Sequence, residues 1–286
     1  TQFGALVEYL GEVYADILAT SSGIYKYNDT TTTWGSRLYA AGLGVSRTGV
    51  VGIVGGTQYL VISDVSNYYY YNGTAWATST TNGDLVAIWD ERLWILQYAT
   101  GRLFYAFAPG TDVQDASLPI WGTGNYASSL FVARDASGEE ILYAACPAGL
   151  FAYDVDNRRF VPTALRLPSL TGWTPHVIQW RDDIYFASRS GIYKYTLGTS
   201  AVIQSVGPDR DDGLPSNKAD VIRWLVGSHG DLIVITSATS GDFWSADAAP
   251  VILAWNGRGW RVLYEGASTE RIRPPLVSGA YGDYRL

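Results

Sequence analysis

A six-residue motif that occurs twice constrains the fold of this chain more than any other feature. The sequence Ser-Gly-Ile-Tyr-Lys-Tyr stands at residues 22–27 and again at residues 190–195. Each copy follows an apolar stretch, at residues 17–20 and 184–188. A motif that recurs within one chain indicates a repeat architecture, in which copies of one small structural unit stack on one another.

Looser copies of the same pattern fill the rest of the sequence. In each of them an apolar stretch is followed by an aromatic one. The pairs are 59–63 with 68–71, 93–96 with 103–106, 141–144 with 150–153, and 232–235 with 251–255. The copies lie roughly 35 to 50 residues apart, which is the period of propeller blades.

Turn signals complete each unit. Asn72-Gly73 and Asn256-Gly257 each follow an aromatic stretch and precede a Trp. Asn-Gly favours a type I′ hairpin turn, because both central positions of that turn need positive φ. Further apolar stretches, such as residues 177–180 and 220–224, precede the core stretches and end in acidic or Gly-containing turns. Each unit therefore predicts four strands, which we name inner, core, aromatic and outer in chain order.

Four-stranded antiparallel sheets that repeat at this period are the blades of a β-propeller. No long segment has the helical period of 3.6 residues. We therefore predict an all-β fold, a β-propeller of four-stranded antiparallel blades with six complete units plus the start of a seventh at about residue 276. We expect residues 1–286 to be a single β-propeller domain. Because a ring of blades has to close, we also expect the chain to be a fragment of a longer polypeptide.

The charge of the chain excludes several classes of partner. The formal net charge is −7, with 27 acidic against 20 basic residues. A nucleic-acid binder needs a basic face, so no nucleic-acid partner is expected. Binding to anionic lipid is disfavoured for the same reason. No apolar run approaches the roughly 20 residues of a membrane-spanning helix, so no membrane insertion is expected.

The sequence contains no recognisable catalytic constellation. Its two histidines, His176 and His229, fall in different units and lack metal-ligand spacing. No Gly-x-Ser-x-Gly elbow, phosphate loop or dinucleotide fingerprint is present. Cys146 stands in an apolar run and is expected to be a buried side chain rather than a reactive thiol. We therefore predict that the chain is not an enzyme, with no catalytic and no cofactor-binding residues.

One acidic segment could hold a metal ion. Asp209, Asp211 and Asp212 precede Gly213 within residues 208–217. Three carboxylates beside a glycine could offer oxygen ligands to calcium, which is the one cofactor that the sequence suggests. The alternative is a solvated loop that leads into the next blade.

Other carboxylate pairs recur at the same place in their units. They are Asp90-Glu91, Glu139-Glu140 and Asp182-Asp183, and each falls between an inner and a core stretch. An acid/base pair for glycoside cleavage would stand at one place only, so the recurrence indicates hairpin turns.

The four consecutive tyrosines at residues 68–71 allow two interpretations. Alternate rings could pack between neighbouring blades, or the rings could form a surface for stacking on carbohydrate. The residues that bind a ligand are unknown at this stage. Propeller ligands meet the loops at one end of the channel, and the candidates are residues 209–217, 42–48 and 112–125.

Two family resemblances follow from these motifs. Residues 211–217, Asp-Asp-Gly-Leu-Pro-Ser-Asn, with the apolar pairs at 221–222 and 232–233, resemble the repeat of two-component-regulator propellers. A wider pattern is similar to uncharacterised β-propeller regions of phage tail-associated structural proteins. It combines Gly-Ile-Tyr-Lys-Tyr, Tyr-Asn-Gly-Thr-x-Trp, the loop that begins at Gly207, and Ala-Trp-Asn-Gly-x-Gly-Trp from Ala254. This second resemblance spans most of the chain.

The second resemblance implies a non-enzymatic binding or scaffold propeller of a virion or extracellular structural protein, such as a phage tail or fibre used in host attachment. The implied partners are other structural protein chains or a surface glycan, and the implied location is the virion or the extracellular space. Two alternatives stay open. One is a ligand-sensing propeller of a bacterial surface protein or two-component sensor, and the other is a glycan-active enzyme.

Overall fold

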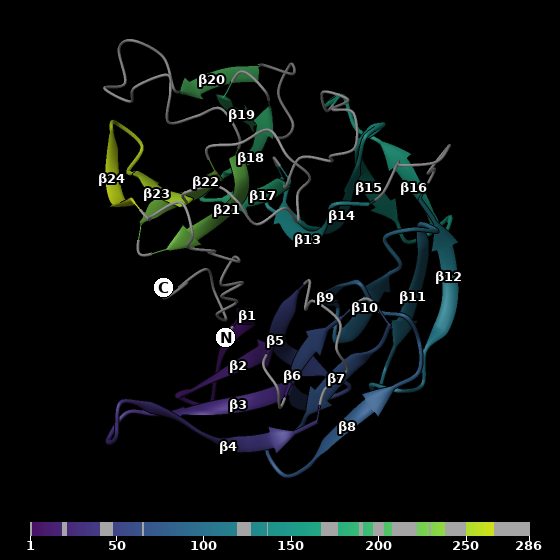
Figure 1. Cartoon of the computed structure of the whole chain (residues 1–286). Coiled ribbons are helices and arrows are strands. Elements are labelled where there is room, and N and C mark those ends of the chain that lie inside the picture. The colour runs from purple at the N-terminus through teal and green to yellow at the C-terminus, as the bar shows by residue number, and fades with distance from the viewer. Residues whose placement is uncertain are drawn as a thin grey trace. The chain divides into compact units, whose positions relative to one another are not determined.

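The computed structural model describes most of the chain, and every regular element in the described part is a β-strand (Figure 1). The described residues are 2–18, 22–40, 48–64, 66–118, 127–135, 137–166, 177–188, 191–196, 203–207, 222–228, 230–237 and 250–265. Within them no helix is long and apolar enough to cross a membrane. The predicted start of a seventh unit, from residue 276, lies outside these residues.

Twenty-four strands are described, in this chain order: β1 (Gln2–Tyr9), β2 (Glu12–Leu18), β3 (Gly23–Asn28), β4 (Thr33–Tyr39), β5 (Gly49–Val54), β6 (Thr57–Ser63), β7 (Tyr68–Tyr71), β8 (Trp76–Ser79), β9 (Leu85–Trp89), β10 (Arg92–Leu96), β11 (Arg102–Ala106), β12 (Val113–Ser117), β13 (Ser129–Arg134), β14 (Glu140–Cys146), β15 (Gly149–Asp154), β16 (Arg159–Pro162), β17 (Val177–Trp180), β18 (Asp183–Ser188), β19 (Gly191–Thr196), β20 (Ile203–Gly207), β21 (Ile222–Ser228), β22 (Asp231–Ser237), β23 (Pro250–Trp255) and β24 (Trp260–Glu265).

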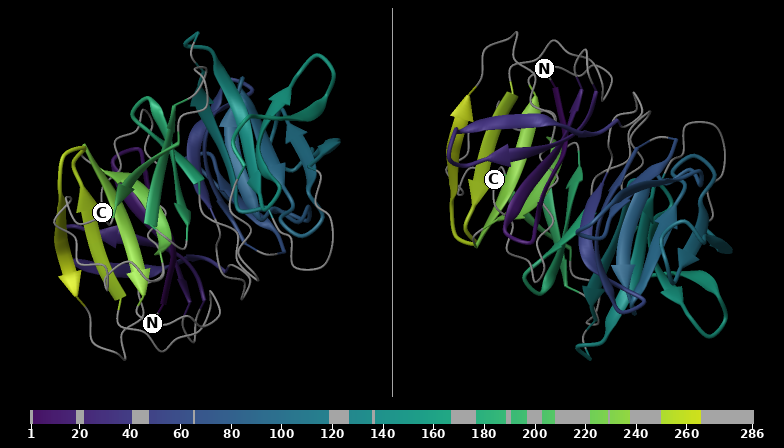
Figure 2. Two further views of the ribbon diagram at one scale, coloured as in Figure 1. Left: turned by 90° about the horizontal axis from the view of Figure 1, so that it is seen from above. Right: turned by 90° about the horizontal axis from the view of Figure 1, so that it is seen from below.

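The described strands form six four-stranded antiparallel sheets, each made of four strands consecutive in the chain. We number these sheets blades 1 to 6, from β1–β4 to β21–β24 (Figures 1 and 2). The predicted order of inner, core, aromatic and outer strand is confirmed in every blade. The two copies of the motif occupy equivalent places, in the aromatic strands β3 and β19.

The chain divides into two compact units. The first contains blades 1 to 3, and the second contains blades 4 to 6. Each unit has its own buried cores, one between each pair of successive blades.

In the first unit the tyrosine run of β7 faces both neighbouring blades. Tyr69 and Tyr71 pack in the cluster with side chains of blade 1, such as Tyr9. Tyr68 and Tyr70 pack in the cluster with side chains of blade 3, such as Leu93. Successive side chains of a strand point to opposite faces of the sheet. The interpretation that alternate rings pack between blades is therefore confirmed.

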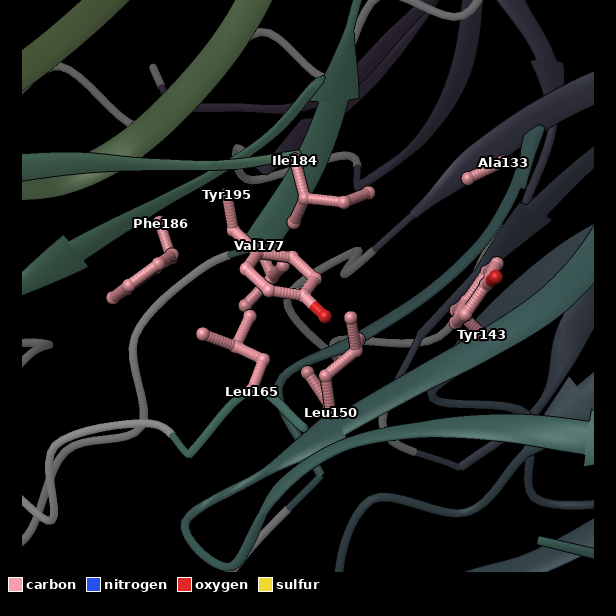
Figure 3. Packing of buried hydrophobic residues seen from close by; sticks show 9 residues of the cluster. Ala133, Tyr143, Leu150, Leu165, Val177, Ile184, Phe186 and Tyr195 are labelled. Atoms are coloured by element: carbon pink, nitrogen blue, oxygen red, sulfur yellow. The ribbon is translucent and has the colours of Figure 1, made fainter. Parts of the chain in front are cut away.

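In the second unit the same kind of packing joins blades 4, 5 and 6. Leu150 and Leu165 of the blade 4 region meet Ile184 and Tyr195 of blade 5 (Figure 3). Trp180 lies in the next cluster, with side chains of blade 6. A core strand is thus covered on both faces, which explains its continuous apolar sequence, and burial of this area drives the stacking.

Two details of the prediction were wrong. Residues 112–125 were expected to be one connecting loop, but residues 113–117 form the outer strand β12. Outer strands are partly solvated and need few apolar residues, so the sequence of this strand resembles that of a polar loop. The inner strand of blade 6 extends to Ser228, beyond the stretch at 220–224 that predicted it.

The Asn-Gly turns are hairpin connections, but they are not two-residue type I′ turns. Tyr71 pairs with Trp76, which leaves a four-residue loop. Asn72 Oδ1 accepts hydrogen bonds from the Thr74 and Ala75 amides, both at 3.0 Å. The side chain of Asn256 makes the same contacts in blade 6, at 2.8 and 3.0 Å. The Asn-Gly pair therefore predicted the hairpin because Asn forms an Asx turn, in which its side chain accepts hydrogen bonds from backbone amides two and three residues later.

Candidate functional site

The two ends of a blade carry connections of very different length. Inner–core turns and aromatic–outer turns lie at one end, which we name the turn end. None of the turn-end connections between the described strands is longer than six residues. This end is therefore built mainly from tight hairpins.

The opposite end, which we name the loop end, carries the core–aromatic and outer–inner connections. Five of these connections are nine to fourteen residues long: 40–48, 118–128, 163–176, 208–221 and 238–249. Binding residues in proteins of this kind are commonly placed in the connections between the strands of a rigid scaffold. The loop end is thus the candidate functional site.

Buried polar side chains mark the same end. Six are buried in the described part of the chain, and all stand at strand ends that adjoin loop-end connections: Ser22, Ser63, Asp64, Ser79, Asp84 and Ser129. Buried polar groups are stable only where they are hydrogen-bonded. Their positions indicate that the loop ends of individual blades are organised by polar contacts, in contrast to the apolar blade faces.

In the first unit these contacts join the inner strands of blades 2 and 3. The Val86 amide donates to Thr48 Oγ1 at 2.9 Å. The Ser63 hydroxyl donates to the Asp84 carbonyl oxygen, also at 2.9 Å. The Tyr98 amide donates to Asp84 Oδ2 at 2.9 Å. The start of the blade 3 inner strand is thereby held to blade 2 and to its own core–aromatic connection.

The second unit repeats this device. The Val177 amide, at the start of the blade 5 inner strand, donates to Ser129 Oγ of blade 4 at 3.0 Å. Thr48 directly precedes the inner strand β5, and Ser129 is the first residue of the inner strand β13. A hydroxyl at the start of one inner strand thus accepts from the next inner strand in both units.

The carboxylate of Asp64 orders a loop-end connection. Its Oδ1 accepts the amides of Ser66 at 2.6 Å and Asn67 at 2.7 Å. Its Oδ2 accepts the Tyr69 hydroxyl at 2.8 Å. The role of this buried acid is to fix the chain between β6 and β7.

Most of the predicted site residues lie outside the described part of the chain. This holds for Asp209, Asp211 and Asp212, and for His176 and His229. Within the described residues no group of three or more His, Cys, Asp or Glu side chains could hold a metal ion.

Two other predictions are confirmed. Asp90 and Glu91 form a turn-end hairpin in which both residues have a φ of 51°. Cys146 is only 1% exposed, and burial raises the pKa of its thiol.

The sequence did not predict the bridging hydroxyls. Ser and Thr are common at strand ends, so one of them carries no signal alone. A signal exists only when the units are compared, because a hydroxyl residue then recurs at the beginning of an inner strand, as Thr48 and as Ser129.

Six stacked blades of four strands define a six-bladed β-propeller, so the predicted fold class is confirmed. No protein-family model matches the sequence, and neither does any curated protein. Among solved structures, the chain is similar to virginiamycin B lyase from Staphylococcus aureus, with a TM-score of 0.62 and 11% identity over 92% of this chain and 84% of that one.

Two further structures show how varied these relatives in fold are. YCF48 from Cyanidioschyzon merolae has a TM-score of 0.56 and 9% identity, over 91% of this chain and 84% of that one. The GH74 enzyme from Niastella koreensis has a TM-score of 0.54 and 13% identity, over 92% of this chain and 46% of that one. At such identities the likeness concerns the fold alone.

The comparisons correct one prediction. The chain was predicted not to be an enzyme because no catalytic motif stands out in its sequence. That prediction was wrong, because the structures that share this fold include a lyase and a GH74 enzyme. One fold can carry enzymes and non-enzymes alike, so the lack of a recognised motif gave no ground for that prediction.

Proposed function

We propose that this propeller is a recognition module, which binds a surface glycan or another protein chain through the loops of its loop end. The observation that carries this proposal is the asymmetry of the blades, with connections of up to fourteen residues at one end and of six at most at the other. The polar bridges at Thr48, Ser63 and Ser129 give these loops a rigid base.

The setting that we propose is a virion or an extracellular assembly, such as a phage tail or fibre. The motif pattern of the sequence supports this setting, as does the net charge of −7, which disfavours nucleic acid as the partner. A ligand-sensing propeller of a bacterial surface protein would use the same end.

Turnover of the bound ligand is the second candidate function. The specific observation in its favour is that virginiamycin B lyase and the GH74 enzyme share the fold. A glycan-active enzyme would need two carboxyl groups about 5 to 10 Å apart. The binding experiment therefore includes a measurement of products.

The experiment is a screen of the whole chain on a glycan array and on bacterial cell surfaces. Two variants replace residues 167–176, which follow the buried Leu165 and its neighbour Arg166, or residues 208–221 with a short Gly-Ser linker. A control variant replaces the turn-end loop at residues 155–158, which lies in the same unit. We expect binding by the wild type and the control, and at least a tenfold loss in one loop-end variant at an unchanged Tm.

Equal binding by all variants would contradict the proposal. Absence of binding to glycans and cells would exclude the glycan as the ligand. Mass spectrometry of the captured glycans separates recognition from turnover, because an enzyme releases shortened or unsaturated products.

Calcium is proposed as a structural ion of the same end. Asp209, Asp211 and Asp212 fall within the connection 208–221 and offer carboxylate oxygens. Titration with CaCl2 in a calorimeter should give heat for the wild type and none for the triple Asp→Asn variant. An identical heat in both would exclude these residues as ligands.

A further inference from the structure

The opposite end of the first unit exposes large apolar side chains. Leu10 is 64% exposed, Phe107 57% and Ile53 51%, and these are the three most exposed large hydrophobic residues in the described part of the chain. All three stand in or beside hairpins of the turn end, one in each of blades 1, 2 and 3. We name them the turn-end patch.

Contacts between successive blades connect the parts of this patch. A Cβ atom at Gly73, in a blade 2 hairpin, would lie 3.8 Å from Leu10 Cδ1 of blade 1. A Cβ atom at Gly55, in the other turn-end hairpin of blade 2, would collide with the Phe107 carbonyl oxygen of blade 3. The Gly55 amide also donates to the Glu91 carbonyl oxygen of blade 3 at 2.9 Å.

Ile53 belongs to the hairpin of blade 2 that contains Gly55. It pairs with Gln58 across the hairpin of blade 2, and the carbonyl oxygen of Gln58 accepts the Tyr9 hydroxyl of blade 1 at 3.1 Å. The hairpins that carry the three side chains therefore contact one another from blade 1 to blade 2 and from blade 2 to blade 3.

Leu10 is unfavourable at its position in two independent ways. It exposes an apolar side chain to water, and its φ of 52° is a left-handed conformation that favours Gly, Asn or Asp. The fold does not require Leu at this position, since Asn tolerates the left-handed conformation and its polar side chain is favourable in water. Of the six described non-Gly residues with positive φ, Leu10 is the only apolar one, and it is an exposed apolar residue of this kind that points to a contact with a partner.

The charges around the patch indicate what covers it. The two basic residues described at this end are already paired, Lys26 with Glu12 at 2.9 Å and Arg92 with Asp90 at 3.3 Å. The guanidinium of Arg92 also lies over the Phe107 ring, 4.8 Å from its centroid. Glu91 and Asp29 add further exposed negative charge.

We propose that the turn-end patch docks a segment of another protein chain that carries apolar anchor side chains and flanking Lys or Arg residues. The apolar anchors would cover Leu10, Ile53 and Phe107, and the basic residues would face the acidic rim. A second copy of this chain fits less well, because two acidic rims would face each other. The propeller would then connect two partners, one at each end.

The experiment uses a phage-displayed library of random 12-residue peptides. Selection is carried out on the whole chain, with counter-selection on the double variant Leu10→Asn, Phe107→Ser. The expected peptides carry aromatic or aliphatic residues together with a net positive charge. No enrichment, or enrichment of peptides without positive charge, would overturn the proposal.

The best peptide is then synthesised and measured by fluorescence anisotropy. We expect at least a tenfold loss of affinity for the double variant, and a loss with rising salt. Leu38→Thr is the matched control, since Leu38 is 47% exposed on the outer strand of blade 1, and should bind as the wild type does. Equal affinity of the double variant would refute the site.

Two measurements separate this proposal from its alternatives. Leu10→Asn alone should keep or raise the Tm, because Asn tolerates the left-handed conformation, so a loss of binding cannot be ascribed to misfolding. Hydrogen exchange should show protection by the peptide at residues 9–12, 53–57 and 105–109, and protection confined to other segments would overturn the proposal. A wild-type dimer that Leu10→Asn dissociates would identify a second copy as the occupant instead.

Discussion

Arg181 of blade 5 donates a hydrogen bond from its Nη2 to the carbonyl oxygen of Gly230 in blade 6, at 2.8 Å. The same guanidinium lies over the ring of Trp180, 4.3 Å from the centroid, and also reaches the Asn256 carbonyl oxygen at 3.4 Å. One side chain thus connects the inner–core hairpin of one blade to both hairpins of the next blade. Its planar guanidinium suits this role because it can stack and donate at once.

The first prediction concerns the substitution Arg181→Lys. Lysine keeps the charge but loses the stacked plane and the two directed donors, so we expect the unfolding free energy to fall by about 1 kcal/mol. Arg134→Lys is the control, because Arg134 is 65% exposed and its guanidinium pairs with Glu140 of its own blade. We expect a change within about 0.5 kcal/mol. Urea denaturation measures both, and equal losses would contradict the bridging role.

The second prediction concerns the hydroxyl of Tyr68. It donates to Asp112 Oδ1 at 2.5 Å and accepts the Gly110 amide at 2.7 Å, so blade 2 is held to the aromatic–outer connection of blade 3. Tyr68→Phe takes this partner from both groups in a partly buried place. We expect a destabilisation of about 2 kcal/mol.

Tyr71→Phe is the matched control in the same strand. The Tyr71 hydroxyl donates to the Gly73 carbonyl oxygen at 2.8 Å in an exposed place, where water replaces it. We expect a loss of about 0.5 kcal/mol or less. Denaturation curves that do not distinguish the two variants would argue against the network at Asp112.

The strands that the sequence predicted most directly are those buried on both faces. Leu93, Trp94 and Ile95 of blade 3 are each 1% exposed or less, so their stretch is continuously apolar and easily recognised. The repeated motif also has a physical reason. A Cβ atom at Gly23 would collide with the Tyr39 carbonyl oxygen, so this strand position requires glycine.

The remaining parts of the fold and of the site lack such a signal. The outer strand β12 is half solvated, and its first residue, Val113, is 48% exposed. The bridge from Val86 to Thr48 joins residues 38 positions apart, which local patterns cannot reveal. Leu10 looks like one more apolar residue until its φ of 52° and its exposure are known.

The third prediction compares two neighbouring glycines of one hairpin. Gly55 and Gly56 both have positive φ, of 54° and 78°. A Cβ atom at Gly56 would meet nothing within 4 Å, whereas one at Gly55 would collide with the backbone of Phe107. Gly56→Ala should therefore lower the unfolding free energy by about 1 kcal/mol, because alanine is unfavourable in this backbone conformation.

Gly55→Ala adds a steric clash between blades 2 and 3 to the same backbone cost. Because overpacking of this kind costs typically 1–3 kcal/mol more, we expect a total of about 3 kcal/mol. Thermal unfolding of the two variants under identical conditions measures the difference. A Gly56→Ala variant as unstable as Gly55→Ala would mean that the close approach to Phe107 is not what the hairpin requires.

The last prediction concerns stability at alkaline pH. Burial raises the pKa of Tyr143 to about 12, with a smaller contribution from Asp135, and burial likewise raises the pKa of Tyr185 to about 12, with a smaller contribution from Asp183. Below the usual tyrosine pKa of about 10 both hydroxyls are neutral in the folded and the unfolded chain, so their contribution to stability is complete.

Between pH 10 and pH 12 only the unfolded chain ionises these tyrosines, so the unfolding free energy falls as the pH rises through this window. Denaturation midpoints measured at several pH values should show this fall. The double variant Tyr143→Phe, Tyr185→Phe should show a shallower one, since phenylalanine does not ionise in either state. Tyr264→Phe is the control, because Tyr264 is 39% exposed. The unfolding free energy of this variant should fall as steeply with pH as that of the wild type. If the unfolding free energy of the double variant falls equally steeply, burial of these two hydroxyls does not govern the alkaline loss of stability.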